Sequence, residues 1–184
     1  MYETNQSLPE QATIVIGITG GIGSGKSTIA NALHLPVYDS DSRAKQLVAA
    51  DSELSARVSA LVAQDPFAHK QVMDELNKLI HPRVLRDCEQ WIKDMARHHN
   101  RLVIESAILF RSSMNKLCDV TIAVTAPEQV RIARIMARNS LSQVEAVKRL
   151  RAQTPQDETD KADYVIINDG NHTIDEIIKQ INTI

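Results

Sequence analysis

Aromatic residues are scarce in this chain, at only 3% of its 184 residues. Proteins that bind single-stranded nucleic acids stack successive bases on aromatic side chains, so this class is disfavoured. The formal net charge of -2 provides no overall basic excess for nucleic acid or for an anionic membrane surface. We therefore expect neither a nucleic acid nor a membrane as a partner.

Cysteine is scarce as well. Cys88 and Cys118 lie far apart without C-x-x-C spacing, so the pattern predicts neither a disulfide framework nor a zinc site. The N-terminal segment MYETNQSLPEQA is polar, and no window approaches the roughly 20 apolar residues that a membrane-spanning helix needs. These features favour a soluble, unsecreted protein in the reducing cytoplasm.

The length and the apolar pattern predict one α/β domain with no room for a second one. Short β-branched runs, typical of strands buried on both faces of a parallel sheet, alternate with helical patterns. This alternation predicts a doubly wound, mostly parallel five-stranded sheet with helices on both faces. The expected strands are Ile14–Thr19, Leu35–Tyr38, Leu102–Ile104, Val120–Val124 and Tyr164–Ile167.

Helix signals fill the connections between these strands. One helix is expected to begin near Lys26, a second to run from about Ser42 to Ala50, and residues 51–100 are mostly helical. Pro82 disfavours a helical conformation at His81. Later helix starts are indicated by Pro127 at a first helical position and by two capping boxes, Ser142 with Glu145 and Thr173 with Glu176. Ile174, Ile177, Ile178 and Ile181 form the core stripe of the last helix.

The segment GGIGSGKS at residues 20–27 matches G-x-x-x-x-G-K-[ST] between a predicted strand and a predicted helix. Such a P-loop turns consecutive backbone N–H groups toward a phosphate, and the helix N-terminus adds partial positive charge. Lys26 would reach the β- and γ-phosphates, and Ser27 would offer its hydroxyl to Mg²⁺. We expect the ATP phosphates to be held by Gly21, Ile22, Gly23, Ser24, Gly25, Lys26, Ser27 and Thr28.

Two other interpretations of the loop are weaker. A plain glycine-rich turn would not need the lysine and the hydroxyl. A dinucleotide-binding G-x-G-x-x-G loop fits worse, because Gly21, Gly23 and Gly25 alternate and Lys26 follows directly. The sequence also lacks the N-K-x-D motif of GTPases and is too short for a large ATPase. These exclusions leave a small-molecule kinase. Such a kinase needs a carboxylate near the acceptor hydroxyl and a lid that carries arginines.

Carboxylates follow two of the predicted strands. Asp39 and Asp41 come after the second strand, where alternation along an extended segment would place them on the same side. Asp41 could instead be a carboxylate stabilised by a helix dipole. Glu105 follows the third strand, where a carboxylate can order Mg²⁺ or its waters, although a solvated strand end has the same pattern.

Arginines at three- and four-residue spacing predict a lid over residues of about 128–160. Arg131, Arg134 and Arg138 share roughly one helix face, and such arginines can neutralise a transferring phosphoryl group. Arg138, at the end of the helix, is the expected catalytic residue. A solvated basic face is the alternative.

The segments GITGGIGSGKST, VYDSDSRAK, LNKLIHP, VIESAILF and QTPQDETDKADYVIINDG together resemble the dephospho-coenzyme A kinase family from Ile14 onward. The resemblance implies transfer of the ATP γ-phosphoryl group to the 3′-hydroxyl of dephospho-CoA, the last step of coenzyme A biosynthesis. It implies ATP and dephospho-CoA as substrates and Mg²⁺ as cofactor. A monomer is compatible with the sequence.

The resemblance also suggests roles for individual residues. Asp41 matches the family's catalytic aspartate, with Lys26 and Arg138 expected beside it and Ser27 and Glu105 expected at Mg²⁺. Asn168 and Asp169 match a loop on the adenine side of ATP. His81 and Pro82 match an HP pair in a helical acceptor-binding insert, at about residues 51–100, where His81 is not expected to be a general base.

The sequence departs from the family pattern between about Val62 and Asp74, which is short, and at Arg111, where a glutamate is usual. Neither departure involves the P-loop or Asp41, so we expect the chemistry to be retained better than acceptor recognition. Two other functions stay open at this point. One is a kinase for a nucleoside, nucleotide or shikimate-like acceptor, and the other is an ATP-binding switch without turnover.

Overall fold

A parallel sheet forms the centre of the computed structural model, which describes residues 12–64, 69–152 and 159–184. It is five-stranded, in the order β2-β3-β1-β4-β5. The expected α/β fold is thereby confirmed. The strands are β1 (Ile14–Thr19), β2 (Val37–Asp39), β3 (Arg101–Glu105), β4 (Val120–Thr125) and β5 (Tyr164–Ile167).

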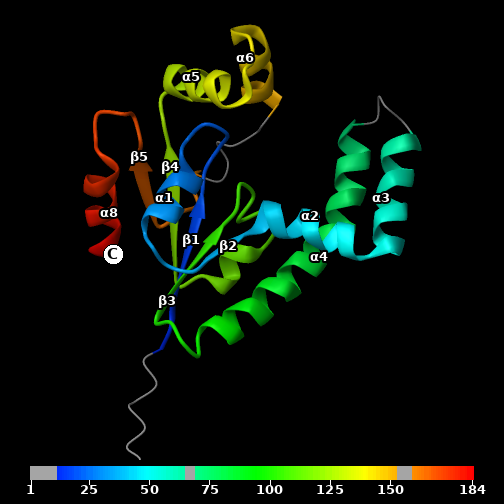
Figure 1. The fold of residues 1–184 in the computed structure, drawn as a ribbon, viewed down its shortest axis with the longest axis horizontal. Coiled ribbons are helices and arrows are strands. Elements are labelled where there is room, and N and C mark those ends of the chain that lie inside the picture. Colours follow the sequence, from blue (N-terminus) through cyan, green and yellow to red (C-terminus); the bar gives the residue numbers. More distant parts are fainter. Residues whose placement is uncertain (1–11, 65–68, 153–158) are drawn as a thin grey trace, which may run out of the picture.

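The helices cover both faces of this sheet and the carboxyl ends of its strands (Figure 1). In the picture, α1 and α8 lie on one side of the sheet, α5 and α6 stand above the carboxyl ends of the strands, and α3 projects sideways with the first half of α4. The helices are α1 (Lys26–Ala32), α2 (Ser40–Ala50), α3 (Ser52–Gln64), α4 (His69–Met95), α5 (Glu128–Asn139), α6 (Gln143–Ala152) and α8 (Ile174–Asn182), with a 3₁₀ turn at Met114–Leu117.

Alternating side chains of the strands build two core layers. Ile16 and Ile18 of β1 pack on one face with buried residues of α1 and α8, including Ile177 and Ile181. Val15 faces the other way, into a cluster with α4 and the 3₁₀ turn. β1 is therefore buried on both faces after Ile14, as its continuous apolar run predicted, whereas three of the four residues of β5 are exposed. A third cluster joins α5 to α6.

The boundary between β2 and α2 differs from the expected one. The helix begins at Ser40 rather than near Ser42 because Asp39 caps it. Oδ1 of Asp39 accepts hydrogen bonds from the backbone N–H groups of Asp41 and Ser42, both at 3.0 Å. Asp41 consequently lies in the first helical turn, and the expectation of an extended segment carrying both aspartates is wrong.

Pro82 lies inside α4, so the expected interruption at His81 is also wrong. A proline in a helix interior costs about 3 kcal/mol because it lacks an N–H and crowds the preceding turn. The next turns of α4 bury Val84 and Cys88 in the core cluster beside β1, and this packing offsets the cost.

The two capping boxes are confirmed. Glu145 accepts a hydrogen bond from the backbone N–H of Ser142 at 3.0 Å, and the Thr173 and Glu176 pair makes both reciprocal bonds. Pro127 is the N-cap of α5, which begins at Glu128, so the expectation that Pro127 occupies the first helical position is wrong by one residue.

Several sequence features lie outside the described residues. They are most of the polar N-terminal segment, Pro66 in the short stretch before α4, and residues 153–158 of the QTPQDETDKADYVIINDG segment. Across the described part of the chain, no helix is both long enough and apolar enough to cross a membrane.

Candidate active site

A cavity of about 650 Å³ opens at the carboxyl edge of the sheet and is lined in part by residues of α5. Ligands of open α/β sheets bind at this edge. The cavity receives residues from the loop after β1, the start of α2, the end of β3, α5 and the segment after β5. They are Gly21, Ile22, Gly23, Gly25, Lys26, Ser27, Thr28, Asp39, Asp41, Ser42, Lys45, Glu105, Ala107, Arg134, Ile135, Arg138, Asn168 and Ile174.

Nearly the whole predicted phosphate loop lines this cavity, the exception being the buried Ser24. The loop leads into α1 at Lys26 through Gly25, whose φ of 93° lies in the left-handed region that glycine tolerates. Backbone N–H groups at the start of a helix lack helical partners and carry partial positive charge. The segment can therefore hold an anion.

Lys26 and Glu105 meet at one wall of the cavity. Lys26 Nζ lies 3.0 Å from Oε1 of Glu105. β1 pairs directly with β3, with Ile18 opposite Glu105, so the sheet places the end of β3 beside the loop that follows β1. Glu105 is only 5% exposed, and the buried carboxylate is balanced by the lysine charge.

The two aspartates after β2 are not equivalent. Both oxygens of Asp39 are engaged by α2, because Oδ1 accepts from the backbone and Oδ2 accepts from the Ser42 hydroxyl at 2.6 Å. Asp41 is exposed and lines the cavity. Its carboxylate is thus placed to meet a bound molecule, whereas Asp39 is a helix cap.

The arginines of α5 divide into two groups. Arg131 and Arg134 donate hydrogen bonds to backbone carbonyls of the phosphate loop. Arg134 also lines the cavity, as does Arg138, which lies one turn further along and is exposed. Burial lowers the pKa of Arg131. The shared helix face was predicted, but the attachment of two arginines to the loop was not, because sequence spacing says nothing about distant backbone groups.

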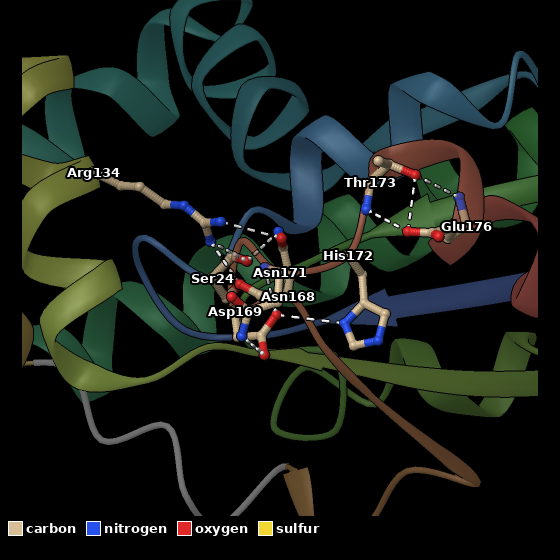
Figure 2. A network of polar contacts seen from close by, with 8 residues as sticks. All are labelled: Ser24, Arg134, Asn168, Asp169, Asn171, His172, Thr173 and Glu176. Carbon is tan, nitrogen blue, oxygen red and sulfur yellow. Dashed lines mark hydrogen bonds and ion pairs between the residues drawn. The ribbon is translucent and has the colours of Figure 1, made fainter.

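Asn168 follows β5 and connects three segments (Figure 2). Its side chain donates to the Ser24 carbonyl at 2.9 Å and accepts from Arg134 at 3.1 Å. It is only 4% exposed. Asp169 turns away to bond Asn171 and His172, so only Asn168 reaches the cavity.

Lys45 is a cavity residue that the sequence interpretation missed. It lies four residues after Asp41 on α2, and residues at this spacing share a helix face. The four-residue spacing of Asp41 and Lys45 is visible in the sequence, but it places them on one face only once Asp41 is known to be helical.

His81 lines a second cavity, of about 570 Å³, between α4 and residues 111–113. Burial and the nearby positive charge of Arg111 lower the pKa of His81. Because His81 does not line the main cavity, its position fits the expectation that it is not a general base there.

Burial raises the pKa of the free thiols of Cys88 and Cys118 to about 12, so both are poor nucleophiles.

The donors at the main cavity suit Mg²⁺ bound together with phosphates. Mg²⁺ typically keeps several waters and takes one or two protein carboxylates plus substrate oxygens. Ser27 and Glu105 both line this cavity and have such oxygens. Among residues 12–64, 69–152 and 159–184, no group of three or more His, Cys, Asp or Glu residues could hold a metal without a substrate.

Comparison with known proteins agrees with this geometry. The dephospho-CoA kinase family model matches residues 14–173. A dephospho-CoA kinase of Porphyromonas gingivalis is 35% identical over 93% of this chain and 94% of its own length. One of Chlorobaculum tepidum is 34% identical over 93% of each chain.

A solved structure from Thermus thermophilus has the same fold. It superposes with a TM-score of 0.74 at 30% identity, covering 94% of this chain and 97% of that one. The profile match, the sequence identities and the fold agree, so the chain belongs to the dephospho-CoA kinase family, whose ATP-dependent kinases catalyse the final step of coenzyme A biosynthesis.

Proposed function

We propose that the main cavity binds ATP and dephospho-CoA together and that γ-phosphoryl transfer to the 3′-hydroxyl takes place beside Asp41. One observation carries this proposal. Asp41, Lys26 and Arg138 come from three separate elements and line the same cavity as the phosphate loop. A kinase needs this combination of a phosphate grip, a carboxylate for the acceptor and a lid cation.

On the nucleotide side, the backbone N–H groups from Gly21 to Thr28 would surround the ATP phosphates. Lys26 would exchange its contact with Glu105 for the β- and γ-phosphate oxygens, and Arg138 would neutralise charge on the transferring group. Asn168 would lie beside the adenine side of ATP, as the resemblance suggests.

On the acceptor side, Asp41 would accept a hydrogen bond from the 3′-hydroxyl and orient its oxygen in line with the γ-phosphorus. The new O–P bond forms as the bond to the β-phosphate oxygen breaks, and the hydroxyl proton passes late to the Asp41 carboxylate. The products are coenzyme A and ADP. Asp39 is unsuited to this role because α2 uses both of its oxygens.

Ser27 and Glu105 would hold Mg²⁺, which neutralises phosphate charge when it is bound with ATP. We also propose that α3 and α4 form the acceptor-binding insert and that α5 and α6 form the lid. A cytoplasmic location would keep Cys88 and Cys118 reduced, as they are in the described part of the chain.

The experiment is a coupled assay of ADP production from MgATP with and without dephospho-CoA. Mass spectrometry of the product then tests for the added 3′-phosphate. Acceptor-dependent ADP together with the mass of coenzyme A is the expected result. ADP release stimulated by a nucleoside monophosphate but not by dephospho-CoA would contradict the proposal.

A further inference from the structure

Three consecutive carbonyls of the phosphate loop accept hydrogen bonds from side chains of α5 and of the segment after β5. Arg131 Nε donates to the Ile22 carbonyl at 2.8 Å. Arg134 Nη1 donates to the carbonyls of Gly23 at 3.3 Å and Ser24 at 3.2 Å. The Ser24 carbonyl also accepts from Asn168 Nδ2 at 2.9 Å. The loop is thus attached to α5 and to the segment after β5.

The direction of these carbonyls determines the direction of the N–H groups. A trans peptide is planar, so the N–H of the next residue points away from each C=O. With the carbonyls of Ile22 and Ser24 turned toward these side chains, the N–H groups of Gly23 and Gly25 point away from them. The intervening N–H of Ser24 closes the turn by bonding the Gly21 carbonyl at 3.1 Å. The contacts with Arg131, Arg134 and Asn168 therefore favour a loop conformation in which these two N–H groups can bind an anion.

Two loop glycines make room for these contacts. A Cβ on Gly25 would lie 2.2 Å from Asn168 Nδ2, and one on Gly23 would lie 2.7 Å from the Arg131 carbonyl. Both have positive φ, of 93° and 78°. Because neither glycine has a side chain, the backbone of Arg131 and the side chain of Asn168 can lie against the loop, and the loop can make its tight turn.

Arg134 also fixes Asn168. Its Nη2 donates to Asn168 Oδ1 and its Nη1 to the Asn168 carbonyl, both at 3.1 Å, and Figure 2 shows the guanidinium reaching toward this segment. Asn168 is anchored to β4 by a bond from its own N–H to the Thr125 carbonyl at 2.7 Å. Both N–H groups of Nη1 and one of Nη2 are thus used within the protein, so at most Nε and one N–H of Nη2 remain for a phosphate.

We propose that Arg134 and Asn168 are positioning residues that preorganise the phosphate loop before ATP binds, and that they set ATP affinity without contributing to acceptor binding. Arg134 then differs from Arg138, which is expected to act on the transferring phosphoryl group. The inference refines the proposed function, but its main test measures ATP binding alone and does not depend on which acceptor is used.

The test is calorimetric titration of MgATP into Arg134→Ala, Asn168→Ala and the double variant, with no acceptor present. Each single variant should bind ATP about tenfold more weakly, the size expected for losing hydrogen bonds from a charged or buried donor. The fold-loss of ATP affinity in the double variant should be smaller than the product of the fold-losses in the two single variants, because both residues bond the Ser24 carbonyl. Arg86→Ala, at an exposed arginine of α4, is the control.

Turnover measurements separate positioning from a general structural role. KM for ATP should rise while KM for dephospho-CoA and the thermal midpoint stay near wild-type values. Arg134→Lys should recover only part of the ATP affinity, since an ammonium cannot reproduce the planar fork.

ATP affinities within twofold of wild type for both single variants, or strictly multiplicative effects in the double variant, would overturn the proposal. If Arg134→Ala does not fold, the ATP affinity of Arg134→Lys is the test, and an affinity equal to that of wild type would overturn the proposal as well. Wild-type protein that binds ATP but ignores dephospho-CoA would contradict only the proposed function.

Discussion

Lys26 Nζ and Glu105 Oε1 form an ion pair at 3.0 Å between the start of α1 and the end of β3. Both side chains are largely buried, with 14% and 6% of their side-chain surfaces exposed. A buried charge that loses its partner is costly, so neither residue can be changed without effect on the other.

We predict that Lys26→Ala lowers kcat/KM by at least about 10²-fold, because a preorganised positive charge on the phosphates is removed. Steady-state assays with MgATP and dephospho-CoA measure this loss. Lys179→Ala, at an exposed lysine of α8, should retain wild-type activity. Activity within threefold of wild type in Lys26→Ala would rule out the phosphate role.

Asp41→Asn should lower kcat by about 10²-fold or more, the usual contribution of a positioned general base, while ATP binding stays unchanged. Asp39→Asn is the matched control, because asparagine caps helices as well as aspartate does, so turnover should change much less. The measurements are turnover and ATP titration on both variants. Equal losses of ATP binding and turnover in Asp41→Asn would instead favour a shared role with Mg²⁺.

Asp87 joins α4 to β2 and α2. It accepts from the Tyr38 hydroxyl at 2.6 Å and from Arg43 Nε at 2.9 Å. The hydrogen bond from Arg43 is the main reason that the pKa of Asp87 lies below its ordinary value, with Tyr38 adding to the effect. A carboxyl whose pKa is lower in the folded state stabilises the protein above its unfolded pKa and loses this effect as pH falls through the folded pKa.

Asp87→Asn should therefore lower the free energy of unfolding by about 1–3 kcal/mol at pH 7, the range for hydrogen bonds to a charged group. The difference from wild type should shrink as pH falls below about 4, the ordinary pKa of aspartate, and its charge-dependent part should be lost below the lower pKa of the folded state. Urea unfolding across pH checks this, with Asp94→Asn as the control on the same helix. A difference that is independent of pH would argue against the charged contact.

Gly17 lies in the middle of β1 where the 3₁₀ turn region approaches the sheet. A Cβ there would lie 2.6 Å from Cys118 Sγ and 2.9 Å from Leu109 Cδ2. Gly17→Ala should destabilise the fold by about 1–3 kcal/mol through overpacking, as measured by denaturant unfolding.

Adding Cys118→Ala should restore part of that loss, because the nearest atom is removed while Leu109 stays. Gly170→Ala is a useful contrast: no atom lies within 4 Å, so only its φ of 91° opposes the substitution. Purely additive effects of Gly17→Ala and Cys118→Ala would show that the contact is not the cause.

Local chemistry explains which features were predictable. Three features depend only on residues that are close together in the sequence, and all three have the expected form. They are the loop GGIGSGKS, the capping box of Thr173 with Glu176, and the isoleucine stripe of α8. The errors arose where distant packing competes with local preference. Pro82 stays helical because Val84 and Cys88 are buried, and Asp41 is helical because Asp39 caps α2.

The sequence alone determined the strands, most helix starts and the form of the loop that we propose binds phosphates, because the hydrophobic period, caps and turns depend on residues that are close together in the chain. The tertiary structure alone decided the strand order, the pairing of Lys26 with Glu105, and the contacts of Arg134 and Asn168 with Ser24, which cross 110 and 144 residues. Such contacts depend on which strands become neighbours, and that outcome is set by burial over the whole sheet.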